Sequence, residues 1–285
     1  MVPRDYLVLE EKGGGFFVVN HEVESYYHQE KKERFVAQRM VVKIGSSTIT
    51  EGKTRVDTEF INDIARQASI LFHAGVKIVI VSSGAVDTGN ILIRQSGKDS
   101  QNKKKAALFG QSELTAQWVT AFGGLKVIAG VHLVSEDELE KAKELLTDEI
   151  MSVGVLVING YDAVNDDSEE ERRNMITADN DKLAAFVSRS INADTSLFLT
   201  DVDGVLDEKG SVIPFVDRLE DIEDVIIEKG SGGTGGMWGK CIDAKHLARE
   251  GQRSIIANGK TSNVLLRIAR GENLGTRFGK GWMIY

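Results

Sequence analysis

The sequence predicts an α/β protein built on an open, mostly parallel, twisted sheet with helices on both faces, a three-layer αβα sandwich. From residue 39 onward, short apolar runs alternate with segments of helical period, which is the pattern of a parallel sheet covered by helices. Polar residues and glycines follow the ends of these runs, as in open sheets that bind ligands beyond the carboxyl ends of their strands. The chain of 285 residues is long enough to bury a large core of this kind.

Six apolar runs are typical of buried strands, because they are short, rich in valine and isoleucine, and bounded by turn-forming residues. The predicted strands cover residues 40–44, 77–81, 125–129, 153–158, 196–200 and 254–257. Between them, apolar residues recur at helical spacing, as Phe60, Ile61 and Ile64 do. The predicted helices cover about 57–74, 104–122, 136–146, 179–191, 240–250 and 262–269, and a small hairpin is predicted around 208–210.

Residues 1–37 differ from the rest and are interpreted as an N-terminal extension. Two apolar segments, 6–9 and 16–19, flank three consecutive glycines, which predicts a β-hairpin. A weakly ordered tail is the alternative, because an isolated hairpin is marginally stable in water. The remainder, residues 38–285, is expected to form the main α/β domain.

Composition and charge exclude several classes of protein. A net charge of −8 argues against nucleic-acid binding, which relies on excess lysine and arginine. The one cysteine, Cys241, excludes an internal disulfide, and the five histidines show no metal-ligand spacing, so no metal-binding residues are predicted. No run approaches the roughly 18 apolar residues of a membrane span, and the N-terminus lacks a signal-peptide core. We therefore expect a cytoplasmic protein that binds no membrane.

The most unusual segment is Gly-Ser-Gly-Gly-Thr-Gly-Gly-Met-Trp-Gly-Lys at 230–240, which precedes a predicted helix. Glycines allow close approach to a ligand, and a helix N-terminus favours phosphate, although a flexible surface loop is the alternative. The segment fits G-x-G-x-x-G, but the residues before it make a poor strand, so a dinucleotide site is not predicted. A Walker A loop is also excluded, because Thr234 stands where its first glycine should be and Cys241 follows Lys240.

Candidate polar groups collect at the predicted strand ends. Each has a simpler explanation alone, since a Ser-Gly pair is usually a turn and Asp179 is as plausible a helix cap as a ligand. Together they favour phosphoryl transfer, which depends on positioned cations and backbone donors; Lys43 and Lys240 would supply positive charge from opposite sides. No histidine or cysteine stands beside an obvious base, so covalent catalysis has little support.

Six ordered blocks over residues 39–278 resemble the amino-acid kinase family. They are Val-Val-Lys-Ile-Gly-Ser-Ser at 41–47, Val-Ser-Ser-Gly-Ala-Val at 81–86, Ala-Ala-Leu-Phe-Gly-Gln at 106–111, Asp-Asn-Asp at 179–181, Leu-Thr-Asp at 199–201 and Gly-Thr-Gly-Gly-Met at 233–237. Gly-Thr-Arg-Phe at 275–278 is similar to the family's closing motif. The resemblance implies the amino-acid kinase fold, with a substrate lobe at about 38–195 and a nucleotide lobe at about 196–285.

The resemblance implies transfer of the γ-phosphoryl group of ATP, with Mg²⁺ on the nucleotide, to the γ-carboxylate of L-glutamate, the first step of proline synthesis. Lys43 and Lys240 would neutralise the transferred group and Asp181 would hold both lysines. The implied ATP-binding residues are Lys43, Gly45, Ser46, Thr200, Asp201, Thr234, Gly235, Gly236, Met237 and Lys240. The implied substrate-binding residues are Ser83, Gly84, Asn159, Asp162 and Asn180. Family members are commonly dimers or tetramers, so a homo-oligomer is expected.

Departures from the family pattern leave the acceptor open. The usual Asn-Glu-Asn-Asp block reads Asn159-Gly160-Tyr161-Asp162, and the segment 200–205 is equally similar to acetylglutamate, isopentenyl phosphate and uridylate kinases. A same-fold kinase for another carboxylate or phosphate is therefore the first alternative. A noncatalytic amino-acid or nucleotide sensor is the second, although retention of both lysines and Asp181 argues against it. The RNA-modification-type domain that follows many bacterial relatives is not expected after residue 285.

Overall fold

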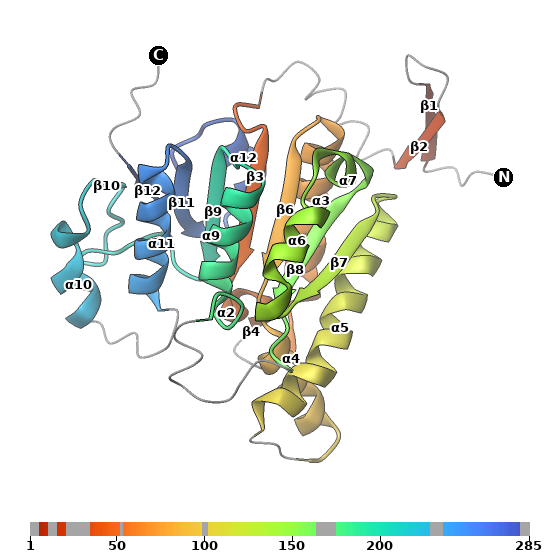
Figure 1. The fold of residues 1–285 in the computed structure, drawn as a ribbon, viewed down its shortest axis with the longest axis horizontal. Helices are drawn as coiled ribbons and strands as arrows, with labels where there is room; N and C mark the ends of the chain where they lie inside the picture. Colours follow the sequence, from red (N-terminus) through yellow and green to blue (C-terminus); the bar gives the residue numbers. More distant parts are fainter. Residues whose placement is uncertain are drawn as a thin grey trace.

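The computed structural model describes residues 6–10, 16–20, 35–51, 54–98, 102–163, 175–228 and 236–279. Its centre is an eight-stranded sheet of order β10-β12-β11-β9-β3-β6-β8-β7 (Figure 1). Every neighbouring pair is parallel except β11 and β12. The strands are β3 (Arg39–Ile44), β6 (Lys77–Ser82), β7 (Ala129–Val134), β8 (Val155–Gly160), β9 (Thr195–Thr200), β10 (Phe215–Val216), β11 (Arg253–Asn258) and β12 (Thr276–Phe278).

The sheet has a topological switch point between β3 and β9. After β3 the chain adds β6, β7 and β8 on one side, and it then returns to place β9, β11 and β12 on the other. In open parallel sheets, ligands bind beyond the carboxyl ends of the strands at such a point. The ends of β3 and β9, at Ile44 and Thr200, therefore mark the expected site.

Helices cover both faces of the sheet, as Figure 1 shows. One face packs on α2 (Ser46–Ile49), α3 (Thr58–His73), α5 (Lys103–Gly124) and α12 (Val264–Ala269), and α4 (Ala85–Gln95) packs on α5. The other face packs on α6 (Leu139–Ala142), α7 (Asp148–Val153), α9 (Asn180–Ser190), α10 (Glu223–Glu228) and α11 (Met237–Arg249). Each face has its own buried apolar cluster, because the side chains of a strand alternate between the two sides. The predicted fold class is confirmed.

Two small antiparallel pairs lie outside the main sheet. The strands β1 (Tyr6–Glu10) and β2 (Phe16–Asn20) pair from Tyr6 opposite Asn20 to Glu10 opposite Phe16. The strands β4 (Thr50–Glu51) and β5 (Arg55–Val56) form a short hairpin before α3. In the described part of the chain, no helix has the length and apolar character needed to cross a membrane.

The strand predicted at 125–129 is misplaced. Leu125 is the C-cap of α5, Lys126 takes a positive φ of 56°, and β7 begins only at Ala129. A short apolar run that follows directly on a helix does not reveal where the helix stops, because both elements are apolar. The strand was therefore predicted four residues too early.

The continuous helix predicted at 136–146 is also wrong. The segment forms two 3₁₀ turns, Glu136–Glu138 and Lys143–Leu145, on either side of α6. The Glu136 carboxylate accepts hydrogen bonds from the backbone of Ile176 and Thr177, 40 and 41 residues further on. This contact holds the first turn to a distant loop, and tertiary structure overrides the high helix propensity of a Glu- and Lys-rich segment.

Several elements were not predicted at all. Helices α4, α7 and α10 and strands β10 and β12 are absent from the predicted set, and α11 begins at Met237, three residues before the predicted start. β10 and β12 have only two and three residues, too few to give an alternating pattern. The residues that precede the glycine-rich segment are helical in α10, so that segment does not follow a strand.

Candidate functional site

Two lysines from distant elements share one buried aspartate. Lys43 lies near the end of β3, Asp181 in the first turn of α9 and Lys240 in the first turn of α11. Lys43 Nζ is 2.7 Å from Asp181 Oδ1, and Lys240 Nζ is 3.2 Å from Asp181 Oδ2. The Asp181 side chain is 1% exposed. The cluster lies at the carboxyl end of β3, beside the switch point.

The cluster has one more positive charge than Asp181 alone can neutralise. Burial lowers the pKa of Lys43, the Asp181 carboxylate opposes that shift, and the Lys240 ammonium adds to it. A buried cation is costly unless it is paired, and here both ammonium groups contact the same carboxylate. An anion placed against both lysines would relieve their repulsion, so the electrostatics of the cluster favour binding of a phosphate group.

The position of Asp181 follows from helix capping. Asp179 is the N-cap of α9, and its side chain accepts a hydrogen bond from Asp181 N at 2.8 Å. An aspartate in the first turn is stabilised by the free N–H groups of the helix N-terminus. Of the two alternatives left open for Asp179, the structure shows the helix cap, and this cap helps to position the carboxylate that binds the two lysines. The third residue of the motif, Asn180, accepts a hydrogen bond from Gly160 N at 3.4 Å.

Gly45 connects β3 to the short helix α2 and lies against the lysine cluster. Its N–H donates to the carbonyl of Leu199, at the end of β9. A Cβ at Gly45 would lie 4.0 Å from Lys43 Nζ. Ser46 begins α2, and the buried Thr48 hydroxyl lies in the same turn with no hydrogen-bond partner among the described residues. Thr48 was not among the predicted site residues, although it follows the matching block by one position.

The ends of β6 and β8 carry the predicted acceptor-binding residues. Ser83 is buried, and Gly84 has a φ of 104°, a conformation that favours glycine, at the N-cap of α4. Asn159 Nδ2 donates to Gln111 Oε1 at 2.7 Å, while Asn159 Oδ1 is buried and has no hydrogen-bond partner in the described structure. An oriented amide with an unused buried oxygen is suited to receive a donor such as an ammonium group. Gln111, which fixes this orientation, was not predicted as a site residue.

Gly160 is a glycine because of packing. A Cβ at this position would overlap the carbonyl oxygen of Thr177. The same Thr177 is held by the Glu136 carboxylate, which accepts from its hydroxyl and its N–H at 2.9 Å. The family's usual glutamate is replaced by glycine at this position, where the 175–179 loop comes too close to β8 for a side chain. Asp162, two residues further on, is partly buried and its N–H donates to the Gly160 carbonyl.

The end of β9 forms the other side of the site. Thr200 is buried and its hydroxyl donates to Asp201 Oδ1 at 3.2 Å, while the Asp201 side chain is exposed. The Thr200 carbonyl accepts from Gly259 N at 2.8 Å. The loop after β11 therefore lies beside the end of β9.

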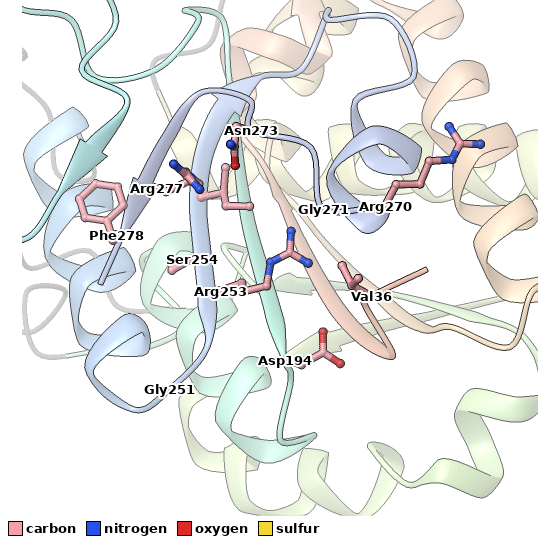
Figure 2. A pocket seen from close by; sticks show the side chains of 11 residues that line it. Val36, Asp194, Gly251, Arg253, Ser254, Arg270, Gly271, Asn273, Arg277 and Phe278 are labelled. Atoms are coloured by element: carbon pink, nitrogen blue, oxygen red, sulfur yellow. The ribbon is translucent and has the colours of Figure 1, made fainter. Parts of the chain in front are cut away.

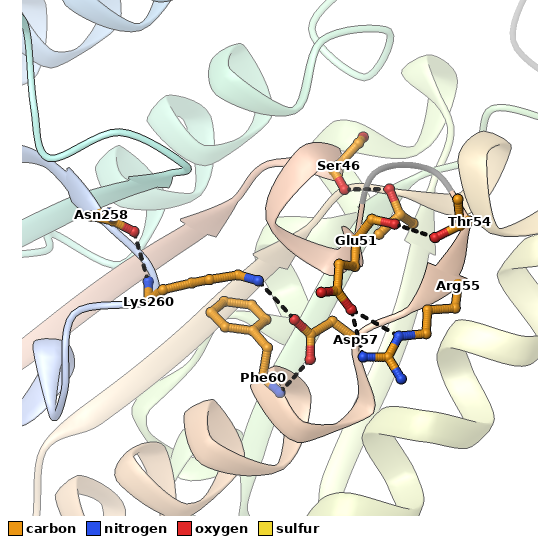
Figure 3. A network of polar contacts seen from close by, with 9 residues as sticks. Ser46, Glu51, Thr54, Arg55, Asp57, Phe60, Asn258 and Lys260 are labelled. Atoms are coloured by element: carbon orange, nitrogen blue, oxygen red, sulfur yellow. Dashed lines mark hydrogen bonds and ion pairs between the residues drawn. The ribbon is translucent and has the colours of Figure 1, made fainter.

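A polar network extends from that loop to the start of α3 (Figure 3). Lys260 Nζ lies 3.1 Å from Asp57 Oδ2, and Asp57 Oδ1 accepts from Phe60 N as the cap of α3. Lys260 N donates to Asn258 Oδ1, and Glu51 pairs with Arg55 in the neighbouring β4–β5 hairpin. These contacts join the loop after β11 to the elements that follow Gly45.

The structure describes only part of the predicted glycine-rich segment. Thr234 and Gly235 lie outside the described residues, whereas Gly236 and Met237 form the start of α11.

Two ionisable side chains of α11 have shifted pKa values. Four residues into this helix, Cys241 is buried, and burial raises its pKa to about 12, so the thiol is protonated at neutral pH. Burial and the nearby Asp181 and Asp179 raise the pKa of Asp243 to about 6. Asp243 was not predicted as part of this region.

The described residues contain no group of three or more His, Cys, Asp or Glu side chains placed to hold a metal ion. The polar groups at the switch point instead form two neighbouring sets. The lysine cluster, Gly45 and Thr48 make a cationic set, and Ser83, Asn159 and Asp162 make a mixed polar set at the ends of β6 and β8. The fold and these sets are those of an enzyme that handles phosphate groups on small molecules.

Comparison with known proteins identifies the class. The model of the Amino acid kinase family matches residues 38–258. The chain is 33% identical to a glutamate 5-kinase of Caldanaerobacter subterraneus over 258 residues, covering 84% of this chain and 67% of that protein. It is 33% identical to one of Dehalococcoides mccartyi, covering 85% and 68%, and 32% identical to one of Haemophilus influenzae, covering 84% and 68%. The chain therefore belongs to the amino acid kinase family, as its motifs indicated, and is a kinase that uses ATP.

Proposed function

We propose that the protein transfers the γ-phosphoryl group of ATP to the γ-carboxylate of L-glutamate, giving glutamyl 5-phosphate and ADP. The observation that carries this proposal is the buried Lys43–Asp181–Lys240 cluster at the switch point of the sheet. Its excess positive charge suits a phosphoryl group in transfer. The glutamate 5-kinase relatives support the choice of acceptor.

In the proposed reaction a carboxylate oxygen attacks the γ-phosphorus, the bond to the β–γ bridging oxygen breaks, and ADP leaves with that electron pair. The attacking carboxylate is already ionised at neutral pH, so no general base is required. Lys43 and Lys240 would neutralise the transferred group from its two sides, and Asp181 would position both. Magnesium would neutralise charge on the nucleotide phosphates and would need few protein ligands.

The polar groups around the cluster would divide between the two substrates. Gly45 and Ser46 would donate backbone N–H groups to phosphate, and Thr200, Asp201 and residues 234–237 would line the nucleotide site. Ser83, Gly84, Asn159, Asp162 and Asn180 would bind the amino acid. The unused buried oxygen of Asn159 supports this assignment, because the substrate's ammonium group is a matching donor.

A second candidate is a kinase of the same family with another acceptor, such as acetylglutamate, isopentenyl phosphate or uridylate. One observation supports this second candidate. Gly160 stands where the family usually has a carboxylate, and its close contact with Thr177 leaves no room for a side chain there. A noncatalytic sensor is less well supported, since all three charged residues of the cluster are present.

Release of ADP, measured with L-glutamate, N-acetylglutamate, aspartate, UMP and isopentenyl phosphate in parallel, tests the proposal. We expect turnover with glutamate, together with hydroxamate formation when hydroxylamine traps the acyl phosphate. Turnover with only UMP or isopentenyl phosphate would show that the acceptor is a phosphate group and not the carboxylate of glutamate. No turnover with any acceptor, despite ATP binding, would favour the sensor.

Wider roles follow from the same proposal. We propose that the enzyme acts at the first step of proline synthesis in the cytoplasm as a homo-oligomer. We also propose that residues 1–37 form an extension to a catalytic domain whose substrate lobe ends near residue 195. Size-exclusion chromatography with light scattering, applied to the full chain and to a chain beginning at residue 35, would test the oligomer and the independence of the extension.

A further inference from the structure

A second cationic pocket lies at the opposite end of the sheet from the lysine cluster. It has a volume of about 420 Å³ and is lined by the starts of β11 and β9, the end of β12, the loop after α12 and the segment that enters β3. Figure 2 shows Arg253 at its centre, with Arg277 and Asn273 on one side and Val36 on the other. Arg253 begins β11 and Asn258 ends it beside Thr200. At about 3.3 Å per residue, the pocket lies roughly 16 Å from the strand ends that carry the candidate active site.

Positive charge exceeds negative charge in this pocket. Arg253, Arg270 and Arg277 line it, and among the described residues Asp194 is the one acidic member of the lining. The Asp194 carboxylate already accepts hydrogen bonds from the N–H groups of Gln38 and Arg39 and from the Thr195 hydroxyl, at 2.7 to 2.8 Å. A local excess of arginine is notable in a chain whose net charge is −8.

Arg253 is held in place by a backbone carbonyl, and its charge is not neutralised by an ion pair with any described residue. Arg253 Nη2 donates to the Ile268 carbonyl at 2.9 Å, whereas Arg253 Nη1 is buried without a hydrogen-bond partner in the described structure. Burial lowers the pKa of Arg253, Asp194 opposes the shift, and the neighbouring Arg277 adds to it. No acidic side chain among the described residues forms an ion pair with Arg253 or Arg277. A half-buried guanidinium with an unused donor is suited to an oxyanion, which it can bind through two parallel hydrogen bonds.

The rest of the lining fits an organic anion better than a bare ion. Val36, Ile255 and Phe278 give the pocket apolar walls, and Asn273 adds an amide. The volume falls in the range of about 300 to 1,000 Å³ that is typical of small-molecule sites. The pocket also contacts the N-terminal segment: Val36 N donates to the Ala269 carbonyl at 2.9 Å, and the Arg270 guanidinium lies 5.7 Å from the Phe35 ring centre.

We propose that this pocket is a second ligand site that binds a small organic molecule through a carboxylate or phosphate group held by Arg253 and Arg277. The site is separate from the proposed ATP and glutamate sites. Its ligand bridges the start of β11 and the end of β12, next to the segment that leads into β3.

Isothermal titration of the full chain with succinate and, separately, with inorganic phosphate tests the proposal and distinguishes the two anion classes. The variant Lys240→Met removes one lysine of the other cationic site, so binding that persists in it does not depend on the intact catalytic cluster. We expect saturable binding of at least one probe, with a Kd below about 10 mM, in the wild type and in Lys240→Met. Arg277→Gln should weaken that binding by about tenfold or more, because a charge-assisted hydrogen bond is lost. Arg277→Lys keeps the positive charge but loses the paired N–H donors of the guanidinium, so its affinity should lie between those of the wild type and Arg277→Gln.

Arg249→Gln is the matched control, because Arg249 is exposed, near in sequence to Arg253, and outside the pocket lining. It should bind the probe as the wild type does. Equal affinity in Arg277→Gln and the wild type would overturn the proposal, and so would loss of binding in Lys240→Met or no saturable binding of either probe. Circular dichroism of Arg277→Gln shows whether this variant is folded. If it is unfolded, the affinities of Arg277→Lys and Arg249→Gln for the probe are compared instead. Equal affinities of these two variants would also overturn the proposal.

Discussion

Lys43 and Asp181 form an almost completely buried ion pair, with 2.7 Å between Nζ and Oδ1, and Lys240 reaches the other oxygen of the same carboxylate. The three residues come from β3, α9 and α11, and the elements meet only because the sheet order reverses between β3 and β9. A buried ion pair adds little net stability compared with apolar packing, but losing one partner is costly. The cluster is therefore better explained by function than by folding.

Replacing the shared carboxylate should affect both stability and turnover. Asp181→Asn removes the carboxylate that Lys43 and Lys240 share in a largely buried cluster, and we expect the free energy of unfolding to fall by about 3 kcal/mol. We also expect kcat to fall by about 100-fold or more, because both cations lose their positioning partner. Urea unfolding and ADP release measure the two effects. Asp148→Asn breaks an exposed pair with Arg39 and should cost less than about 1 kcal/mol. Equal stability losses in the two variants would contradict the structural account.

The acceptor side should respond separately from the nucleotide side. Asp162→Ala should raise the KM for glutamate by about tenfold or more and leave the KM for ATP within about threefold, because the proposed contact is made to the amino acid alone. Initial rates with each substrate varied in turn measure both constants. Asp137→Ala removes an exposed carboxylate from the 3₁₀ turn that follows β7 and should change neither constant. Equal increases in both constants would remove Asp162 from the acceptor pocket.

Gly160 should tolerate no side chain. Gly160→Ala places a Cβ against the Thr177 carbonyl oxygen, and the backbone shift that follows should cost about 1 to 3 kcal/mol of stability. Gly123→Ala is the matched control, because Gly123 lies near the end of α5 with open space around it. That change should be neutral or stabilising by about 1 kcal/mol. If thermal melts place the two variants at the same midpoint, the close approach of β8 and the 175–179 loop is not as described.

The pH dependence of stability should report on Asp243. Its pKa is raised to about 6 in the folded state by burial and by Asp181 and Asp179, so the folded state binds the proton more tightly than the unfolded state does. Stability contributed by the protonated carboxyl should therefore be lost as the pH rises from about 4 to 6 and stay constant above that range. Asp243→Asn should remove this pH-dependent contribution to stability. The melting temperature of the variant should therefore rise relative to that of the wild type as the pH increases from about 4 to 6. Parallel pH profiles would show that Asp243 titrates normally.

The central sheet was predictable because its strands are buried on both faces. The runs at 40–44, 77–81 and 196–200 are short and rich in valine, isoleucine and leucine, and each lies within one residue of the observed strand. Very short strands gave no such signal: β12 has three residues, and its antiparallel pairing with β11 depends on tertiary contacts. The boundary between α5 and β7 was missed for a related reason, since apolar residues continue across it.

The charged cluster could be predicted from motifs, and its supporting residues could not. Lys43, Asp181 and Lys240 each stand in or beside a recognisable block. Gln111 ends the block at 106–111 and Thr48 follows the block at 41–47, but the role of each depends on which strand end it faces. Arg253 and Arg277 are 24 positions apart in a segment that reads as strand and turn, and only the pairing of β11 with β12 brings them into one pocket.

Turnover of Lys43→Met, Lys240→Met and the double variant, measured as glutamate-dependent ADP release, tests the central claim most directly. If both ammonium groups act together on the transferred phosphoryl group, each single change should lower kcat by about 100-fold or more, with much smaller effects on ATP affinity. The double variant should lose far less than the product of the two single effects, because the groups work as a unit. Lys209→Met, which changes an exposed lysine, is the control and should leave kcat unchanged. A near-normal kcat in Lys43→Met or in Lys240→Met would contradict the account.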